Sequence, residues 1–221
     1  MDTNLQTYID KAADEILNPE FAVTKQYLEV NEVVFENGKP KVERVDINYG
    51  DNLVAVYFPF KDERFFLQVN LTKSPDIKVD FVFTENGNRV YFTATSERLT
   101  QEQLSVNFPF KPLTGWSKGD YKKNGKTQYK FSRISFEPFE SEACDLEKQL
   151  ELLLTELEKD SESIRQLTQK ATTYISVCRH QYISGNAGIH FDNRTIHRLA
   201  KLDLSVDIDT YIVGKAINDD D

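Results

Sequence analysis

Residues 145–170, DLEKQLELLLTELEKDSESIRQLTQK, carry the most regular apolar pattern in the chain. The apolar positions recur at steps of four, three, four, seven and three, and they are Leu146, Leu150, Leu153, Leu157, Ile164 and Leu167. Such spacing lines up side chains along one side of an α-helix. We therefore predict one long helix over 145–170, with a single polar gap at residues 160–161. About 26 helical residues would span about 39 Å.

The segments around this helix indicate an α+β unit. Ahead of it, residues 89–95 predict a strand, 96–108 are partly helical with Thr100 and Gln103 at capping-box spacing, and 128–137 alternate as a strand. After it we expect a strand at 172–182, a glycine-rich hairpin turn at 184–188, a short strand at 188–191, a helix at 193–202 capped by Asp192 or Asn193, and a strand at 204–213. Helices packed on one face of an antiparallel sheet predict a ferredoxin-like α/β sandwich with one long helix.

The first 88 residues have a different pattern. Residues 4–17 follow helical spacing, and β-branched and aromatic residues then favour strands at 21–35, 41–49, 53–60, 64–71 and 77–83. Asn37 and Gly38 form a hairpin signal, and we interpret Asn86 and Gly87 as the turn that ends the meander. The prediction is therefore an N-terminal helix plus an antiparallel β-meander at 1–88, an α+β domain at 89–214 and an acidic tail at 215–221.

Composition limits the function classes. The chain has 221 residues, a formal net charge of −9 and two cysteines, Cys144 and Cys178. An acidic balance disfavours nucleic acid as a partner, and no segment has the roughly 18 apolar residues that cross a bilayer. The first residues lack the basic and apolar regions of a secretory signal. We expect a cytoplasmic protein with both thiols reduced, no membrane partner and no cofactor; the oligomeric state stays open.

No catalytic or metal-binding motif is present in the sequence. His180, His190 and His197 lack ligand spacing, although Cys178 and His180 lie two apart on one predicted strand. A nucleophile elbow, a phosphate loop and a dinucleotide fingerprint are all missing. Asp207 and Asp209 share one side of the last strand, but we interpret them as surface acids. We predict no catalytic residues and no metal site.

Two charged regions are candidates for binding a partner, and we expect the acidic one to be the main surface, with the basic one as its competitor. The acidic candidates are Glu151, Glu158 and Glu162 on the long helix, together with Asp207 and Asp209. The basic candidate is residues 116–133, which hold six basic residues and one acid around the only tryptophan. There Trp116 would act as an apolar anchor, with Lys118 and Asp120 beside it. A solvated helix face and a solvated loop are the alternative interpretations.

The second region also shows a family resemblance. Trp116, Lys118, Gly119 and Asp120 in the loop, and Asp207, Asp209 and Tyr211 in the last strand, resemble the domain-of-unknown-function 4279 family over about residues 90–213. Phe136 stands where that family usually carries a tryptophan. The resemblance implies a fold and supplies no catalytic residues. Its members look like small cytosolic bacterial proteins, which favours a binding role.

Two functions follow as hypotheses. The first is a non-enzymatic protein-binding protein, most concretely a bacterial immunity protein that neutralises a cognate toxin by direct binding. An acidic protein can attract a basic toxin electrostatically and block a basic active site with its carboxylates. The second is a small-ligand-binding or enzymatic module that uses the loop at 116–120 and the region of His180 and His190. A toxin gene beside this one would favour the first hypothesis.

Overall fold

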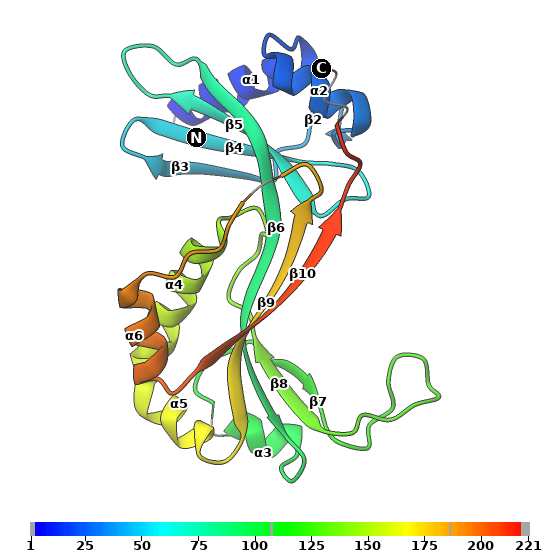
Figure 1. Ribbon diagram of the computed structural model, residues 1–221, viewed down its shortest axis with the longest axis vertical. Helices are drawn as coiled ribbons and strands as arrows, with labels where there is room; N and C mark the ends of the chain where they lie inside the picture. Colours follow the sequence, from blue (N-terminus) through cyan, green and yellow to red (C-terminus); the bar gives the residue numbers. More distant parts are fainter. Residues whose placement is uncertain (1–2, 107, 186, 218–221) are drawn as a thin grey trace.

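One strand, β6 (Val79–Ser96), runs through both halves of the protein (Figure 1). The computed structural model describes residues 3–106, 108–185 and 187–217. The first part of β6 pairs with β5, up to the pair of Phe65 and Asn86. The second part pairs with β9 from Gly87 onward and, on its other edge, with β8. The strand order is therefore β10-β9-β6-β5-β4-β3, with β8 and β7 attached beside β6.

The N-terminal half packs helices on an antiparallel sheet. Its elements are α1 (Thr3–Leu17), α2 (Ala22–Val30), β1 (Phe35–Glu36), β2 (Lys39–Pro40), β3 (Arg44–Gly50), β4 (Leu53–Pro59) and β5 (Phe65–Thr72). Tyr8, Ala12 and Ile16 lie one helical turn apart on α1 and are buried against the sheet. The predicted hairpin is confirmed, because Asn37 and Gly38 both have positive φ between β1 and β2.

The strand predicted at 21–35 is wrong, because most of it forms α2. Thr24 and Tyr27 are buried, and Val23 and Leu28 pack against the same core. These positions fit a helical face as well as a strand, so β-branched and aromatic composition was misleading here. Packing against the sheet decided in favour of the helix.

The second half places its helices on one face of the sheet. Its elements are α3 (Gln101–Val106), β7 (Thr114–Trp116), β8 (Ser132–Phe136), α4 (Leu146–Leu157), the 3₁₀ turn η1 (Glu158–Asp160), α5 (Ser161–Thr168), β9 (Thr172–Tyr182), α6 (Asn193–Lys201) and β10 (Ser205–Val213). Phe92, Ile134, Leu153 and Ile175 belong to one buried cluster between helices and sheet. The predicted caps are confirmed: Thr100 and Gln103 exchange capping-box hydrogen bonds, and Asp192 caps α6.

The long helix predicted at 145–170 is interrupted. The Asp160 carboxylate accepts a hydrogen bond from the Ser163 backbone N–H at 3.1 Å and caps α5 as a new helix. The predicted apolar positions are buried on both sides of this break. The polar gap in the pattern therefore marks a helix start, since a capping residue must leave helical geometry.

The C-terminal strand differs from the expected antiparallel sheet. β10 runs parallel to β9, with Ser205 opposite Tyr174 and Val213 opposite Tyr182. Residues 188–191 form neither the predicted strand nor a hairpin, because the chain passes through α6 before it returns. The α+β class is confirmed, whereas a ferredoxin-like sandwich is not. Residues 218–221 of the predicted tail lie outside the described residues.

Asn86 and Gly87 do not form the turn expected from the sequence, because β6 continues through both. A Cβ atom on Gly87 would lie 1.8 Å from the carbonyl oxygen of Arg64, so only glycine lets the two backbones meet there. Separate apolar cores lie in the two halves. The division into units at 1–88 and 89–214 stays a prediction.

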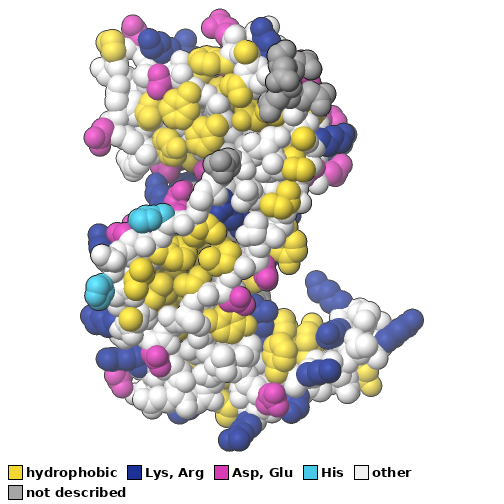
Figure 2. All heavy atoms as spheres, viewed as in Figure 1, with side chains coloured by type: hydrophobic (Ala, Val, Ile, Leu, Met, Phe, Trp, Pro, Cys, Tyr) yellow, Lys and Arg dark blue, Asp and Glu magenta, His cyan; other side chains and the backbone are white. Residues whose placement is uncertain are grey.

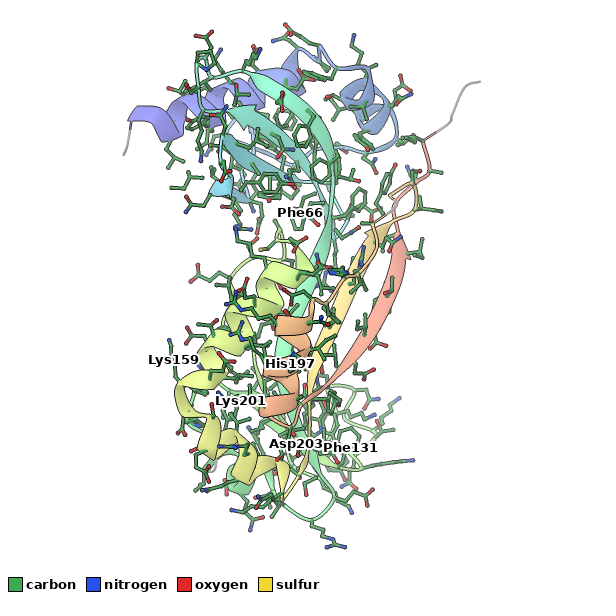
Figure 3. All side chains as sticks on the ribbon, turned by 60° about the vertical axis from the view of Figure 1, so that its left-hand side comes forward. Phe66, Phe131, Lys159, His197, Lys201 and Asp203 are labelled. Atoms are coloured by element: carbon green, nitrogen blue, oxygen red, sulfur yellow. The ribbon has the colours of Figure 1, made fainter. Side chains whose placement is uncertain are left out.

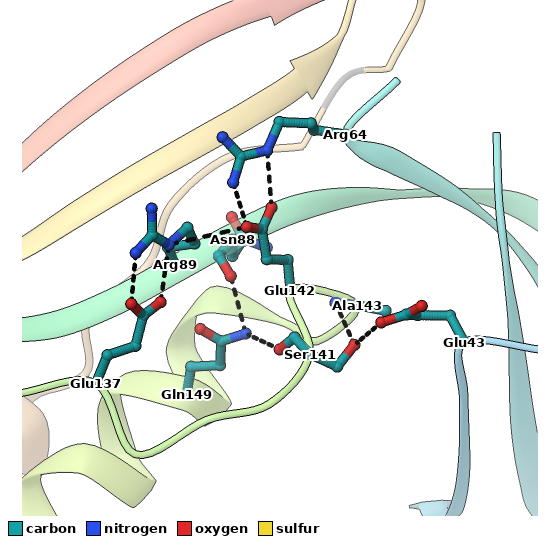
Figure 4. Close-up of polar contacts among 9 residues, drawn as sticks. All are labelled: Glu43, Arg64, Asn88, Arg89, Glu137, Ser141, Glu142, Ala143 and Gln149. Atoms are coloured by element: carbon teal, nitrogen blue, oxygen red, sulfur yellow. Dashed lines mark hydrogen bonds and ion pairs between the residues drawn. The ribbon is translucent and has the colours of Figure 1, made fainter. Parts of the chain in front are cut away.

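A polar segment joins the halves beside this crossing (Figure 4). We call residues 137–145 the waist segment. Its Glu142 carboxylate binds Arg64 of the first half and lies 3.8 Å from Arg89 of the second. Its Ser141 hydroxyl donates to Glu43 at 3.0 Å. Together with β6, these contacts fix the halves relative to each other.

None of the described helices combines the length and the apolar character that crossing a membrane requires.

Candidate protein-binding surface

A hairpin arm projects from the second half, on the side away from α4, α5 and α6 (Figure 1). We call residues 114–136 the Trp116 arm. At its base, β7 pairs with β8, and a Cβ atom on Gly115 would lie 2.0 Å from the Arg133 carbonyl oxygen. Farther out, the Tyr129 N–H donates to the Asp120 backbone carbonyl at 2.9 Å, and the Lys122 N–H donates to the Thr127 backbone carbonyl at 2.7 Å. Between β7 and β8 the arm consists of turns and bends with one isolated bridge, Tyr121 with Gln128, so the region around Trp116 is largely the loop that we predicted.

Cations and aromatic rings alternate along the base of this arm. The Trp116 ring stacks on Tyr129, with centroids 4.2 Å apart. The Arg133 guanidinium lies over the Trp116 ring, 5.4 Å from its centroid. The complete set, which we call the cation–aromatic row, is Arg89, Tyr91, Arg133, Trp116, Tyr129 and Lys122, with each cation 5.4–5.6 Å from a ring centroid. Cation–π contacts of this kind stiffen a segment that has no apolar core of its own.

Exposed lysines and aromatic rings lie along the arm, from its base to its tip. Lys118, Lys123 and Lys126 are exposed, and so are Tyr121 at 66% and Phe131 at 40%. Figure 2 shows Lys and Arg side chains dominating the tip of the projection. The arm thus combines exposed aromatic rings with a local excess of positive charge on an acidic chain.

The polar groups of residues 116–120 already have partners. Trp116 Nε1 donates to the Phe131 carbonyl at 3.0 Å, and the Asp120 carboxylate accepts from the Ser117 N–H at 2.7 Å. The Lys118 ammonium donates to the Glu97 carbonyl at 3.3 Å. These contacts hold the arm together.

Asp207 and Asp209 lie on the same sheet face as the cation–aromatic row. The residues between and beside them, Val206 and Ile208, pack toward the helices. The two carboxylates therefore point to the uncovered face, as the alternation of the strand predicted. On that face Tyr211 stacks on His180, with centroids 5.4 Å apart. The face carries acids on β10 and bases on the Trp116 arm.

The predicted acidic residues of the helix lie in the opposite layer, and each has a basic neighbour. Glu158 binds Arg198 of α6 at 2.8 Å, and this contact lowers the pKa of the Glu158 carboxyl. Glu151 lies 3.4 Å from Arg194, and Glu162 lies 3.5 Å from Arg165. Figure 3 shows Lys159 and Lys201 on this layer as well. The helix face is therefore of mixed charge.

The family comparison agrees with this part of the structure. A family model described as Domain of unknown function (DUF4279) matches residues 85–213, which is more than half of the chain. The chain belongs to this family. No curated protein and no solved structure matches it.

The DUF4279 segment starts inside β6, two residues before Gly87. It contains the whole Trp116 arm, the row and β10, so the candidate surface is formed within the family segment. The N-terminal half adds α1, α2 and the strands from β1 to β5, and it lies outside the match.

Candidates for chemistry by residue type in the DUF4279 segment include Cys178, His180, His190 and His197. Burial raises the pKa of the Cys178 thiol, which keeps it protonated. Burial, with Arg64 nearby, lowers the pKa of His180. His190 donates its backbone N–H to Glu147, and His197 Nδ1 contacts the Asn193 carbonyl. Among the described residues, no group of three or more His, Cys, Asp or Glu side chains could hold a metal ion.

Sequence reasoning found Trp116 and its lysines but missed Tyr91, Arg89 and Arg133. A signal was present, since Arg89 and Tyr91 alternate on one strand and Tyr129, Phe131 and Arg133 on another. The sequence does not show which strands are neighbours in the sheet. These side chains come together only because β6 pairs with β8.

Proposed function

We propose that this protein is a non-enzymatic binding protein that captures a protein partner with the Trp116 arm and the adjoining open sheet face. The observation that carries the proposal is the arm itself, which is basic, aromatic and exposed, and whose two sides are joined by backbone hydrogen bonds. Ordering such a segment in advance lowers the entropy that binding costs. The partner surface would be acidic where it meets the arm and basic where it meets Asp207 and Asp209.

In its most concrete form, the proposal makes this a bacterial immunity protein that binds and neutralises a toxin in the cytoplasm. Inhibition by direct binding needs no chemistry from the inhibitor, only a complementary surface and fast association. The arm and the open face would supply both. This form predicts that the captured partner is toxic alone and harmless in the complex.

The first test compares two surface variants as bait for capture from the native host. The arm variant carries Tyr121→Ser, Lys123→Glu and Lys126→Glu, which leaves the cation–aromatic row intact. The helix variant carries Glu151→Lys and Glu162→Lys; Glu158 is kept because it holds Arg198. We expect one partner, identified by mass spectrometry, to bind the native protein and the helix variant and to be lost with the arm variant.

The purified partner then allows a kinetic test. Its association rate should fall as salt rises, because charges are screened beyond about 8 Å at physiological ionic strength. A partner that binds the arm variant normally and the helix variant weakly would overturn the proposed surface. A captured partner without toxicity would remove the immunity form and leave the binding proposal.

A further inference from the structure

A separate cavity lies at the junction of the two halves. Its volume is about 390 Å³, within the range of small-molecule sites. Tyr27, Tyr49 and Phe83 of the first half line it. Asn88 and Arg179 of the second half line it as well, together with Asp145 at the start of α4. The lining thus combines aromatic rings with polar and charged groups.

The Arg179 guanidinium is buried in this cavity wall without a full set of partners. The residue is only 3% exposed, its Nη2 donates to the Ala187 carbonyl at 2.6 Å, and its Nε has no hydrogen-bond partner. A buried cation needs a counter-charge and acceptors for its donors, since losing water is costly. The positive charge of Arg179 is near enough to lower the pKa of Glu85, but the Nε donor has no acceptor among the described residues, so an anionic group in the cavity would satisfy it.

Asn88 presents an unpaired acceptor next to this unpaired donor. Asn88 and Arg179 are register partners on β6 and β9, and Asn88 is 2% exposed. Its Nδ2 donates to the carbonyls of Cys144 and Asn86 at 2.9 and 3.3 Å, while Oδ1 has no partner. A ligand that satisfies both residues must therefore carry a hydrogen-bond donor close to its anionic group.

Three carboxyl groups line the cavity, and they favour a hydrogen-bond donor that is positively charged. Glu85, Asp145 and Glu147 all line the cavity. Burial raises the pKa of Glu85 to about 7, with Asp145 adding to the rise. Perturbed groups of this kind concentrate at ligand sites. An ammonium group would be favourable beside them, just as a carboxylate would be favourable on Arg179.

We propose that this cavity binds a small zwitterion of the α-amino-acid type with an apolar side chain. Its carboxylate would accept from Arg179, its ammonium would donate to Asn88 Oδ1 and the neighbouring carboxyl groups, and its side chain would lie against Tyr27, Tyr49 and Phe83. The site is separate from the Trp116 arm, so it is a second binding function of the chain.

The test uses calorimetric titration of the full chain with three matched compounds. Phenylalanine carries both charges, phenylalanine amide lacks the carboxylate, and 3-phenylpropionate lacks the ammonium. We expect phenylalanine to bind best and each of the other two at least about tenfold more weakly, equivalent to about 1.4 kcal/mol. Equal binding of phenylalanine amide, or no heat with phenylalanine up to about 10 mM, would overturn the proposal.

Two variants locate the binding. Arg179→Gln should weaken phenylalanine binding at least about tenfold, whereas Arg165→Gln, at an exposed position of α5 that does not line the cavity, should leave it unchanged. Arg179→Lys keeps the charge in case the first variant is unstable, and it should bind with intermediate affinity. The arm variant described above should bind phenylalanine normally. Native affinity in a folded Arg179→Gln protein would place the ligand elsewhere and overturn the assignment.

Discussion

Glu85 gives the protein a pH dependence at the scale of one residue. Its pKa is about 7 in the folded protein against an ordinary value of 4.5, because burial disfavours the carboxylate and Asp145 adds negative charge, with the positive charge of Arg179 opposing the rise. Between these values the folded state holds a proton that the unfolded state releases. The free energy of unfolding therefore falls as pH rises from about 4.5 to 7, by at most about 3 kcal/mol.

The measurement is denaturant unfolding at pH 5 and pH 7 for the native protein and Glu85→Gln. Asp46 and Glu158 have lowered pKa values in the folded protein, so their contributions to the free energy of unfolding change below about pH 4.5, outside the range from pH 5 to pH 7. His180 contributes a pH dependence of opposite sign within this window. Its pKa is lowered from 6.5 in the folded protein, so the unfolded state binds the proton more readily and the free energy of unfolding decreases as pH falls. The difference between the two proteins isolates Glu85. Identical pH slopes for both would contradict the prediction.

At the scale of elements, the helix layer depends on the apolar positions found in the sequence. Leu153 is fully buried on α4, whereas its neighbour Leu152 is 47% exposed. Leu153→Ala should lower the free energy of unfolding by ~2–5 kcal/mol, since it leaves a cavity. Leu152→Ala should change it by no more than about 0.5 kcal/mol. Thermal and chemical unfolding measure both, and similar losses would mean that α4 is rotated relative to the sheet.

The elements also show what the sequence could predict. The helical periods of α1 and α4 and the strand at 172–182 were predicted because each follows one clear pattern over many residues. Residues 22–30 were misassigned because a short apolar run suits either structure until its neighbours are known. The parallel pairing of β10 and the neighbours of Arg133 depend on contacts distant in the chain. The predicted Trp116 region therefore needed the fold before the cation–aromatic row could be recognised.

At the scale of the whole molecule, β6 couples the two halves through Gly87. Gly87→Ala places a methyl group against the Arg64 backbone and should lower the free energy of unfolding by ~1–3 kcal/mol or more. Gly188→Ala is the control, because nothing lies within 4 Å of its added Cβ, and it should change stability by no more than about 1 kcal/mol.

The same experiment reports on the two predicted units. Trp116 is the only tryptophan and lies in the second half, so its fluorescence follows that half, while circular dichroism follows the whole chain. We expect coincident transitions in the native protein, because the halves share a strand and the waist segment. Separate transitions would show that residues 1–88 and 89–214 unfold independently. Equal stability of the two glycine variants would contradict the role given to Gly87.

The free edge of β10 has a consequence for solubility. In the described part of the chain β10 pairs with β9 alone, so its outer backbone groups could accept a strand from another copy and start an aggregate. Asp207 and Asp209 make such self-addition unfavourable, because two copies of this strand would bring like charges together. That protection is electrostatic, and at 1 M salt charges are screened within about 3 Å. Concentrated stocks of this protein should therefore remain clear longest at low ionic strength.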